Sequence, residues 1–81
     1  MGRHNPAARH RPVFAPIERL GPDETLTRCT LAGLELGRIV GKPEFARIRR
    51  YTIILLGEVI GERLDYYEAR RVLVQTWEDQ Q

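Results

Sequence analysis

The chain has 81 residues, of which 42% are hydrophobic and 30% charged, and its formal net charge is +2. This length leaves room for one domain, and the apolar content excludes wholesale disorder. A domain of this size buries only about 60% of its unfolded surface, so association often completes its core. No apolar run approaches the roughly 20 residues that cross a bilayer, and none follows the first arginines as in a signal peptide. We therefore expect a soluble cytoplasmic protein without membrane contact.

The charges are segregated along the chain. Residues 1–20 carry four Arg and one acid (+3), and residues 21–41 carry two Arg and three acids (−1). Residues 42–51 carry four basic residues and one acid (+3), and residues 52–81 carry three Arg and six acids (−3). Twelve of the thirteen basic residues are Arg, which contacts phosphate or carboxylate in a planar, bidentate way. A GC-rich genome explains this arginine bias at least as well as a function does.

Residues 1–22 are predicted to form a flexible basic arm ahead of a single domain at 23–81. The arm contains four of the five prolines and both histidines, and proline excludes a continuous helix. Its substantial apolar residues are Val13, Phe14 and Ile17. They either fix the arm to the body of the protein or dock on a partner.

The segment 24–40 is predicted to be the first helix, with Asp23 as its cap. Its apolar residues recur at helical spacing, and Gly33, Gly37 and Gly41 follow one another at every fourth position. Such a glycine ridge lets another helix approach closely, which offsets the cost of glycine in a helix interior. We expect this ridge to pack within the protein or between subunits.

A long central helix is predicted over 43–64, because Pro43 suits a first helical position. Its apolar residues span about half of the helical circumference, with Gly57 and Gly61 beside them. That apolar face is wider than a helix packed on one side needs, so this helix must touch more than one neighbour.

A third helix is predicted over 66–78, because Asp65 and Glu68 form a capping pattern. The change at Asp65 is either a sharp turn or a kink in one long helix, and we favour the turn. The predicted fold is thus all-α, a small three-helix arrangement with a long central helix and an extended N-terminal arm. The residues expected to be buried are Leu36, Leu55, Val59 and Trp77.

The sequence offers little for catalysis. It contains no serine, and His4 and His10 both lie in the proline-rich arm. Cys29 therefore has no ordered histidine to activate it, and we interpret it as a small buried hydrophobe rather than a reactive thiol. One cysteine and two arm histidines do not make a zinc site. We expect no enzyme activity, no metal or other cofactor, and no small-molecule substrate.

The favoured function is a protein-interaction module, such as a regulator, inhibitor, adaptor or assembly component, that self-associates and binds another protein. Its basis is a surplus of apolar surface for so short a chain. The expected interface residues are Phe14, Ile17, Leu31, Gly33, Leu34, Gly37, Ile54, Gly57 and Gly61.

The alternative function is nucleic-acid binding by a regulatory protein. A flexible arm beside a basic helix is an arrangement found in DNA readers, although a net charge of +2 is small for such a domain. The expected phosphate contacts are Arg3, Arg9, Arg11, Lys42, Arg47, Arg49 and Arg50.

Overall fold

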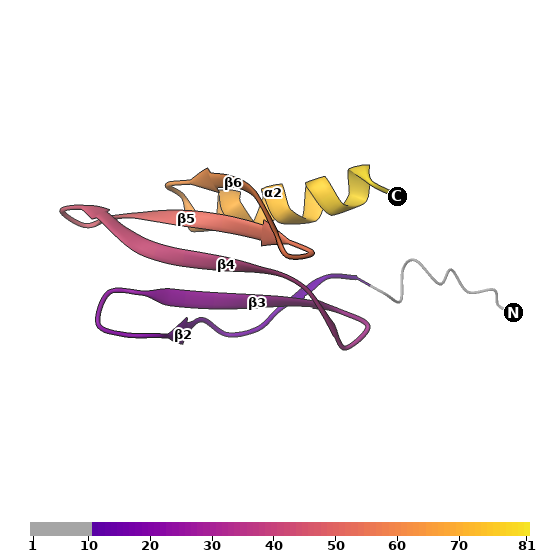
Figure 1. Cartoon of the computed structure of the whole chain (residues 1–81), viewed down its shortest axis with the longest axis horizontal. Coiled ribbons are helices and arrows are strands. Elements are labelled where there is room, and N and C mark those ends of the chain that lie inside the picture. The colour runs from indigo at the N-terminus through magenta and orange to yellow at the C-terminus, as the bar shows by residue number, and fades with distance from the viewer. Residues whose placement is uncertain (1–10) are drawn as a thin grey trace, which may run out of the picture.

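The computed structural model describes residues 11–81, which form an antiparallel sheet followed by one helix (Figure 1). The elements in chain order are β1 (Val13–Phe14), β2 (Glu18–Arg19), β3 (Thr25–Leu31), β4 (Leu34–Phe45), β5 (Ile48–Leu55), β6 (Glu58–Arg63) and α2 (Tyr66–Asp79).

The sheet is a meander with the order β1-β3-β4-β5-β6, and β2 also pairs with β3. Helix α2 packs mainly on β5, and also on β6 and β4. The described residues thus form two layers, in which the helix covers one face of the sheet and no other element covers the opposite face. We call that second face the open face.

The all-α prediction is wrong, and so is the helical bundle it implied. The segments 24–40 and 43–64, expected as helices, are the strands β3 to β6. In β5, Tyr51, Ile53 and Leu55 face the helix, while Thr52 and Ile54 lie on the open face. A strand with apolar residues on both faces lacks the alternation of a half-buried strand, so its sequence resembles the wide stripe of a central helix.

The predicted glycine ridge is also absent, because Gly33 lies in a turn and Gly37 and Gly41 lie in β4. Gly33 and Gly57 end two-residue turns in which both residues have positive φ, namely 52° at Ala32 and 83° at Gly33, then 51° at Leu56 and 85° at Gly57. Positive φ at both positions is the type I′ geometry that matches the twist of a hairpin. These turns join β3 to β4 and β5 to β6.

Gly37 has a packing role within the sheet rather than between helices. A Cβ atom at this position would collide with the backbone carbonyl of Ile54 and would lie 3.1 Å from Cδ1 of Leu73. The absence of a side chain therefore lets β4 lie close to β5 beneath α2.

The third predicted helix is confirmed, because α2 runs from Tyr66 to Asp79. The Asp65 carboxylate accepts a hydrogen bond of 2.9 Å from the backbone N–H of Glu68, which is the expected cap. The change at Asp65 is the turn from β6 into α2. Helix α2 has 14 residues, and in the described part of the chain no helix is long and apolar enough to span a membrane.

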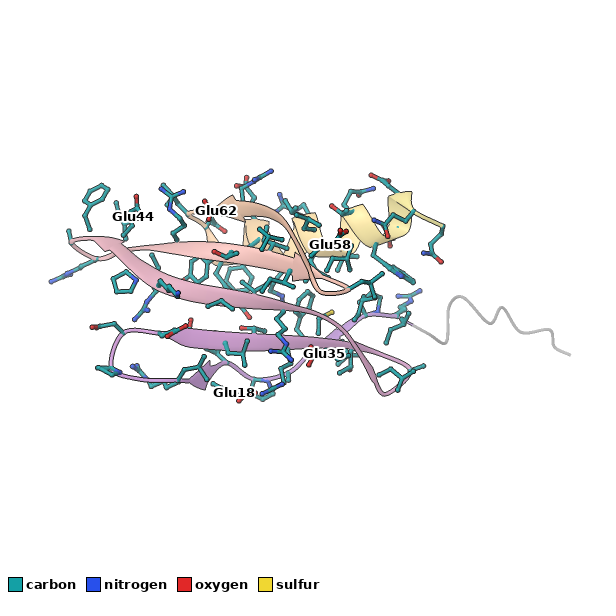
Figure 2. The ribbon with its side chains drawn as sticks, viewed as in Figure 1. Glu18, Glu35, Glu44, Glu58 and Glu62 are labelled. Atoms are coloured by element: carbon teal, nitrogen blue, oxygen red, sulfur yellow. The ribbon has the colours of Figure 1, made fainter. Side chains whose placement is uncertain are left out.

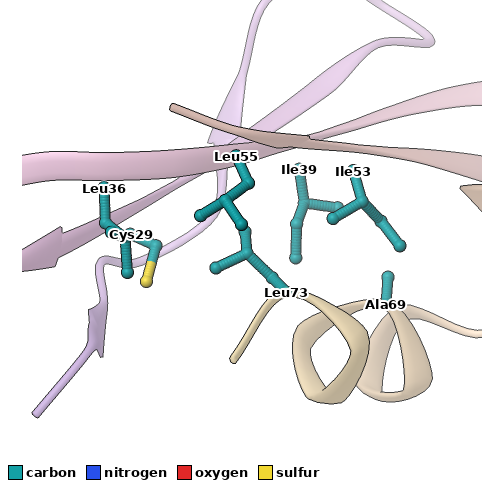
Figure 3. Packing of buried hydrophobic residues seen from close by; sticks show 7 residues of the cluster. All are labelled: Cys29, Leu36, Ile39, Ile53, Leu55, Ala69 and Leu73. Carbon is teal, nitrogen blue, oxygen red and sulfur yellow. The ribbon is translucent and has the colours of Figure 1, made fainter. Parts of the chain in front are cut away.

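The core lies between the sheet and α2 (Figure 3). The expected burial of Leu36 and Leu55 is confirmed, and Trp77 packs against the core while partly buried. Val59 is 64% exposed, so its expected burial is wrong. Its partner across the strands is Ile54, which places Val59 on the open face rather than beneath the helix. The buried cluster comprises Cys29, Leu36, Ile39, Ile53, Leu55, Ala69 and Leu73.

The N-terminal segment contributes to the sheet where it is described. Val13 and Phe14 pair with Thr30 and Cys29, and β2 pairs with the start of β3. Residues 1–10 of the predicted arm lie outside the described residues.

Candidate interaction surfaces

The hairpin of β4 and β5 extends beyond the rest of the sheet at one end (Figure 1). The pairing of β3 with β4 stops at Gly41, and the pairing of β6 with β5 stops at Tyr51. Residues 42–50 therefore form a two-stranded segment without a third strand on either side, and we call this segment the ribbon. Isolated hairpins are marginally stable, so the body of the sheet must hold the ribbon in place.

The tip of the ribbon is apolar. Phe45 and Ile48 are direct partners across the two strands, and they are 63% and 37% exposed. By strand alternation Ile48 lies on the open face, on the same side as Arg50 and Thr52. The ribbon thus presents a largely exposed aromatic side chain with a partly exposed aliphatic one beside it.

The ribbon is also cationic, but only part of its charge is free. Arg50 forms salt bridges of 2.7 Å with Glu44 and 3.2 Å with Glu62, which fix it along the ribbon. The hydrogen bond from Arg50 lowers the pKa of Glu44. This carboxylate therefore stays charged at pH values at which an ordinary glutamate becomes protonated. Within residues 11–81, Lys42 and Arg47 form no salt bridge. Arg49 donates instead to the backbone carbonyl of Asp23.

The opposite end of the sheet carries both type I′ turns, and we call it the turn end. Large apolar side chains are exposed there, with Leu34 75%, Leu56 64% and Val59 64% accessible. An open depression of about 370 Å³ lies between β4 and the second turn. Its lining residues are Glu35, Leu36, Gly37, Arg38, Ile54, Leu56 and Gly57.

Three acidic residues gather at the turn end, which also holds the basic residues Arg11 and Arg38. Glu58 directly follows the second turn, and α2 ends nearby with Glu78 and Asp79 and no basic residue in its last turn. Among the described residues these three carboxylates form no salt bridge. The helix dipole adds partial negative charge at the same place. Figure 2 shows Glu44 on the ribbon and Glu58 toward the other end.

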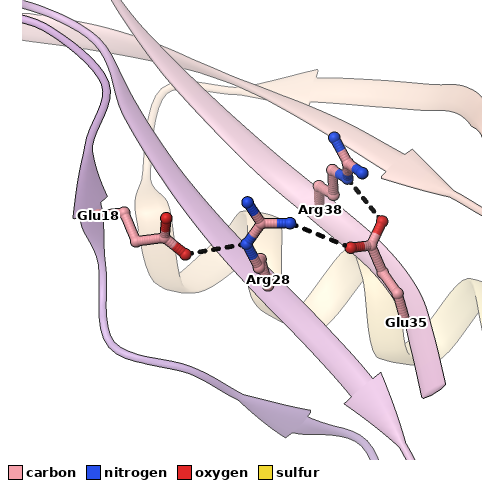
Figure 4. A network of polar contacts seen from close by, with 4 residues as sticks. All are labelled: Glu18, Arg28, Glu35 and Arg38. Carbon is pink, nitrogen blue, oxygen red and sulfur yellow. Dashed lines mark hydrogen bonds and ion pairs between the residues drawn. The ribbon is translucent and has the colours of Figure 1, made fainter.

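A chain of ion pairs covers the open face between β2 and β4 (Figure 4). Arg28 contacts Glu18 at 2.9 Å and Glu35 at 3.4 Å, and Glu35 also bonds Arg38. The hydrogen bond from Arg38 lowers the pKa of Glu35, and the bond to Glu18 raises that of Arg28. Exposed pairs contribute little stability, so this network mainly fixes side-chain positions beside the depression.

The structure gathers some of the expected interface residues and separates others. Ile54 and Gly57 line the depression, and Leu34 lies at the same end of the sheet. Ile17 is 54% exposed beside β2. Four others serve within the fold: Phe14 and Leu31 pack against the core, Gly33 forms the first turn and Gly37 is buried, while Gly61 lies in β6.

The expected phosphate contacts also divide into two groups. Lys42, Arg47, Arg49 and Arg50 all lie on the ribbon. Arg11 is exposed just before β1, which pairs with Thr30 near the turn end. It therefore lies at the other end of the sheet from the ribbon. Arg3 and Arg9 are outside the described residues.

Cys29 is fully buried, which agrees with its interpretation as a small hydrophobe. Burial raises the pKa of its thiol to about 11, although the nearby Arg70 acts in the opposite direction. The reactive thiolate is thus disfavoured at neutral pH. Within residues 11–81, no group of three His, Cys, Asp or Glu side chains is arranged to hold a metal ion.

Three exposed residues were not expected at the surface from the sequence, namely Phe45, Leu56 and Val59. An internal repeat is the signal that points to two of them. Leu31–Gly37 and Leu55–Gly61 share the pattern Leu-x-Gly-x-x-(Leu/Ile)-Gly, and each forms a turn followed by a β-bulge at Leu36 or Ile60. An x-Gly dipeptide between apolar runs is a hairpin signal.

Comparison of the chain with protein-family models, with curated proteins and with solved structures finds no match in any of the three. The case for its function therefore rests on the surfaces described above.

Proposed function

We propose that this protein is a non-catalytic, cytoplasmic interaction module that self-associates through its turn end. The exposed leucine at position 56 carries this proposal. Leu56 has a φ of 51° and is 64% exposed. The left-handed conformation costs about 1 kcal/mol or more for a residue other than Gly, Asn or Asp.

Leucine is not a favoured residue in this position, because type I′ turns prefer asparagine as their first residue. Most of its side chain also stays exposed while the turn end is free. Both costs are offset if a partner covers Leu56. The neighbouring Val59 extends the apolar surface that such a partner would bury, and the depression beside it adds both apolar and polar groups.

The experiment compares the full chain with its Leu56→Asn variant by sedimentation velocity across a concentration series. Because the change relieves the turn, a purely structural role predicts higher thermal stability and unchanged mass. We expect higher stability together with at least a tenfold weaker self-association. Ala32→Asn makes the same change in the first turn and is the matched control. A chain that stays monomeric up to high micromolar concentration contradicts the proposal.

Nucleic-acid binding is the second candidate, and it is supported by the four basic residues on the ribbon. β-ribbons do enter DNA grooves. Two observations weigh against it. Arg50 is neutralised by two glutamates, and Arg11 lies at the opposite end of the sheet from the ribbon.

A mobility-shift assay at two salt concentrations tests this candidate. If the ribbon binds phosphates, replacing Lys42 and Arg47 with glutamine should reduce the slope of log K against log salt by nearly two units. Self-association without any retardation of duplex or single-stranded DNA would exclude it.

A further inference from the structure

We propose that the self-association is head to tail, with the ribbon tip of one copy seated in the depression at the turn end of the next. This inference rests on the proposed function and names the surface that meets the turn end. The ribbon and the turn end lie at opposite ends of the sheet (Figure 1).

The apolar groups are complementary in form. Phe45 projects from a narrow two-stranded segment and is 63% exposed, with Ile48 beside it. The depression has a volume of about 370 Å³, and Leu36, Ile54 and Leu56 contribute to its lining. A phenyl ring is small enough to enter it, and the exposed Val59 lies across the strands from Ile54.

The charges are complementary as well. Lys42 and Arg47 flank the tip and form no salt bridge within residues 11–81, and neither does Glu58, which follows the second turn on the helix side of the sheet. A tip seated next to Leu56 brings these cations toward Glu58 and toward the acidic end of α2. Two copies joined turn end to turn end would instead bring together the carboxylates of Glu58, Glu78 and Asp79, and like charges suppress such pairing.

The symmetry of the assembly follows from this placement. A contact between two different surfaces of the same chain is heterologous, so each added copy exposes a new tip and a new depression. The assembly therefore grows into an open chain unless its rotation closes a ring. Its mass rises with concentration beyond that of a dimer.

The test uses two variants of the full chain, each damaged at one end. Phe45→Asp impairs the tip and leaves the turn end intact, while Leu56→Asn impairs the turn end and leaves the tip intact. Both positions are exposed, so both variants should fold, which circular dichroism verifies. We expect each variant alone to be monomeric at concentrations where the wild type assembles. An equimolar mixture should form a 1:1 dimer of twice the monomer mass and nothing larger, because only one good tip and one good depression remain.

A second pair tests the charges in the same way. Arg47→Glu and Glu58→Arg should each weaken assembly at least tenfold, and mixing them should restore a dimer that weakens as salt is added.

The outcomes separate this inference from the function on which it rests. If Leu56→Asn blocks assembly while Phe45→Asp does not, the turn end is an interface but the ribbon is not its partner, and the inference fails alone. The inference also fails alone if assembly of the wild type stops at a dimer and mixing the two variants restores no complex. A wild-type chain that is monomeric at every concentration overturns both proposals. If that monomer also binds DNA, with loss of binding in Phe45→Asp, the ribbon serves nucleic acid instead.

Discussion

The guanidinium carbon of Arg70 lies 4.4 Å from the centroid of the Phe14 ring, which joins α2 to the first strand of the sheet. The same group lies 5.8 Å from the ring of Tyr66 and 5.5 Å from that of Tyr67. Arg70 makes no salt bridge within the described residues, so these aromatic faces are its main contacts. Phe14 is thereby held against the body of the protein.

Replacing Arg70 with methionine should loosen β1 from the helix. The variant keeps an apolar stem but loses the cation over three rings, which predicts a loss of about 0.5–2 kcal/mol of stability. Hydrogen exchange at the amide of Ala15, which donates to the carbonyl of Arg28, should accelerate more than exchange in β5. Arg70→Lys keeps the charge and should retain part of the protection. Equal acceleration throughout the sheet would contradict a local tether.

The core of the domain depends on Leu55, which is 2% exposed between the sheet and α2. Leu55→Ala should lower the free energy of unfolding by about 2–5 kcal/mol through lost burial and a residual cavity. Val59→Ala is the contrast, because Val59 is 64% exposed and its replacement should change stability by less than about 0.5 kcal/mol. Urea unfolding of the monomer measures both values, and a similar loss in the two variants would reverse the assignment of the two faces.

Substitution in either type I′ turn should increase the stability of the protein. Ala32→Asn and Leu56→Asn each place a residue that tolerates positive φ in a position with φ near 50°. Each should raise the free energy of unfolding by about 1 kcal/mol, seen as a higher melting temperature. If neither variant gains stability, the turns carry no strain, and the conformation of Leu56 does not support a partner at the turn end.

The salt bridge between Glu44 and Arg50 predicts a titration shift on the ribbon. The pKa of Glu44 is lowered, so its pairing stabilises the ribbon above the unfolded pKa of about 4.3. This contribution is lost as the pH falls through the lower folded value. A carboxyl titration followed by NMR should place Glu44 below the usual glutamate range. Arg50→Gln should return it toward that range, whereas Arg38→Gln should leave it unchanged.

The C-terminal helix was predictable because its capping residues are local. Asp65 and Glu68 mark its start within a single turn, and no distant contact is needed to interpret them. The strands were not predictable in this way, since β5 has apolar residues on both of its faces and α2 covers only one. The bulges at Leu36 and Ile60 further break the period-two pattern. They turn the extra apolar residue toward the core and leave a spacing that resembles a helical stripe.

The candidate surfaces were predictable only in part, because their members come together through hairpin pairing. Leu34, Ile54 and Gly57 were expected at an interface and do lie at the turn end. Phe45 lies within the segment predicted as the central helix, and its exposure depends on how far β4 extends past β3. That length is set by the register between strands, which local sequence does not encode.

The length of the free-standing ribbon can change without altering the rest of the sheet. Because no third strand pairs with residues 42–50, one residue can be added to each of its two strands without shifting any register in the body of the sheet. Each such pair moves the tip outward by about 3.4 Å. Two pairs return Phe45 to its original face, whereas one pair turns it to the other. The spacing between the tip and the rest of the domain can therefore change in small steps, by paired insertions or deletions in the two strands of the ribbon, while the core remains as it is.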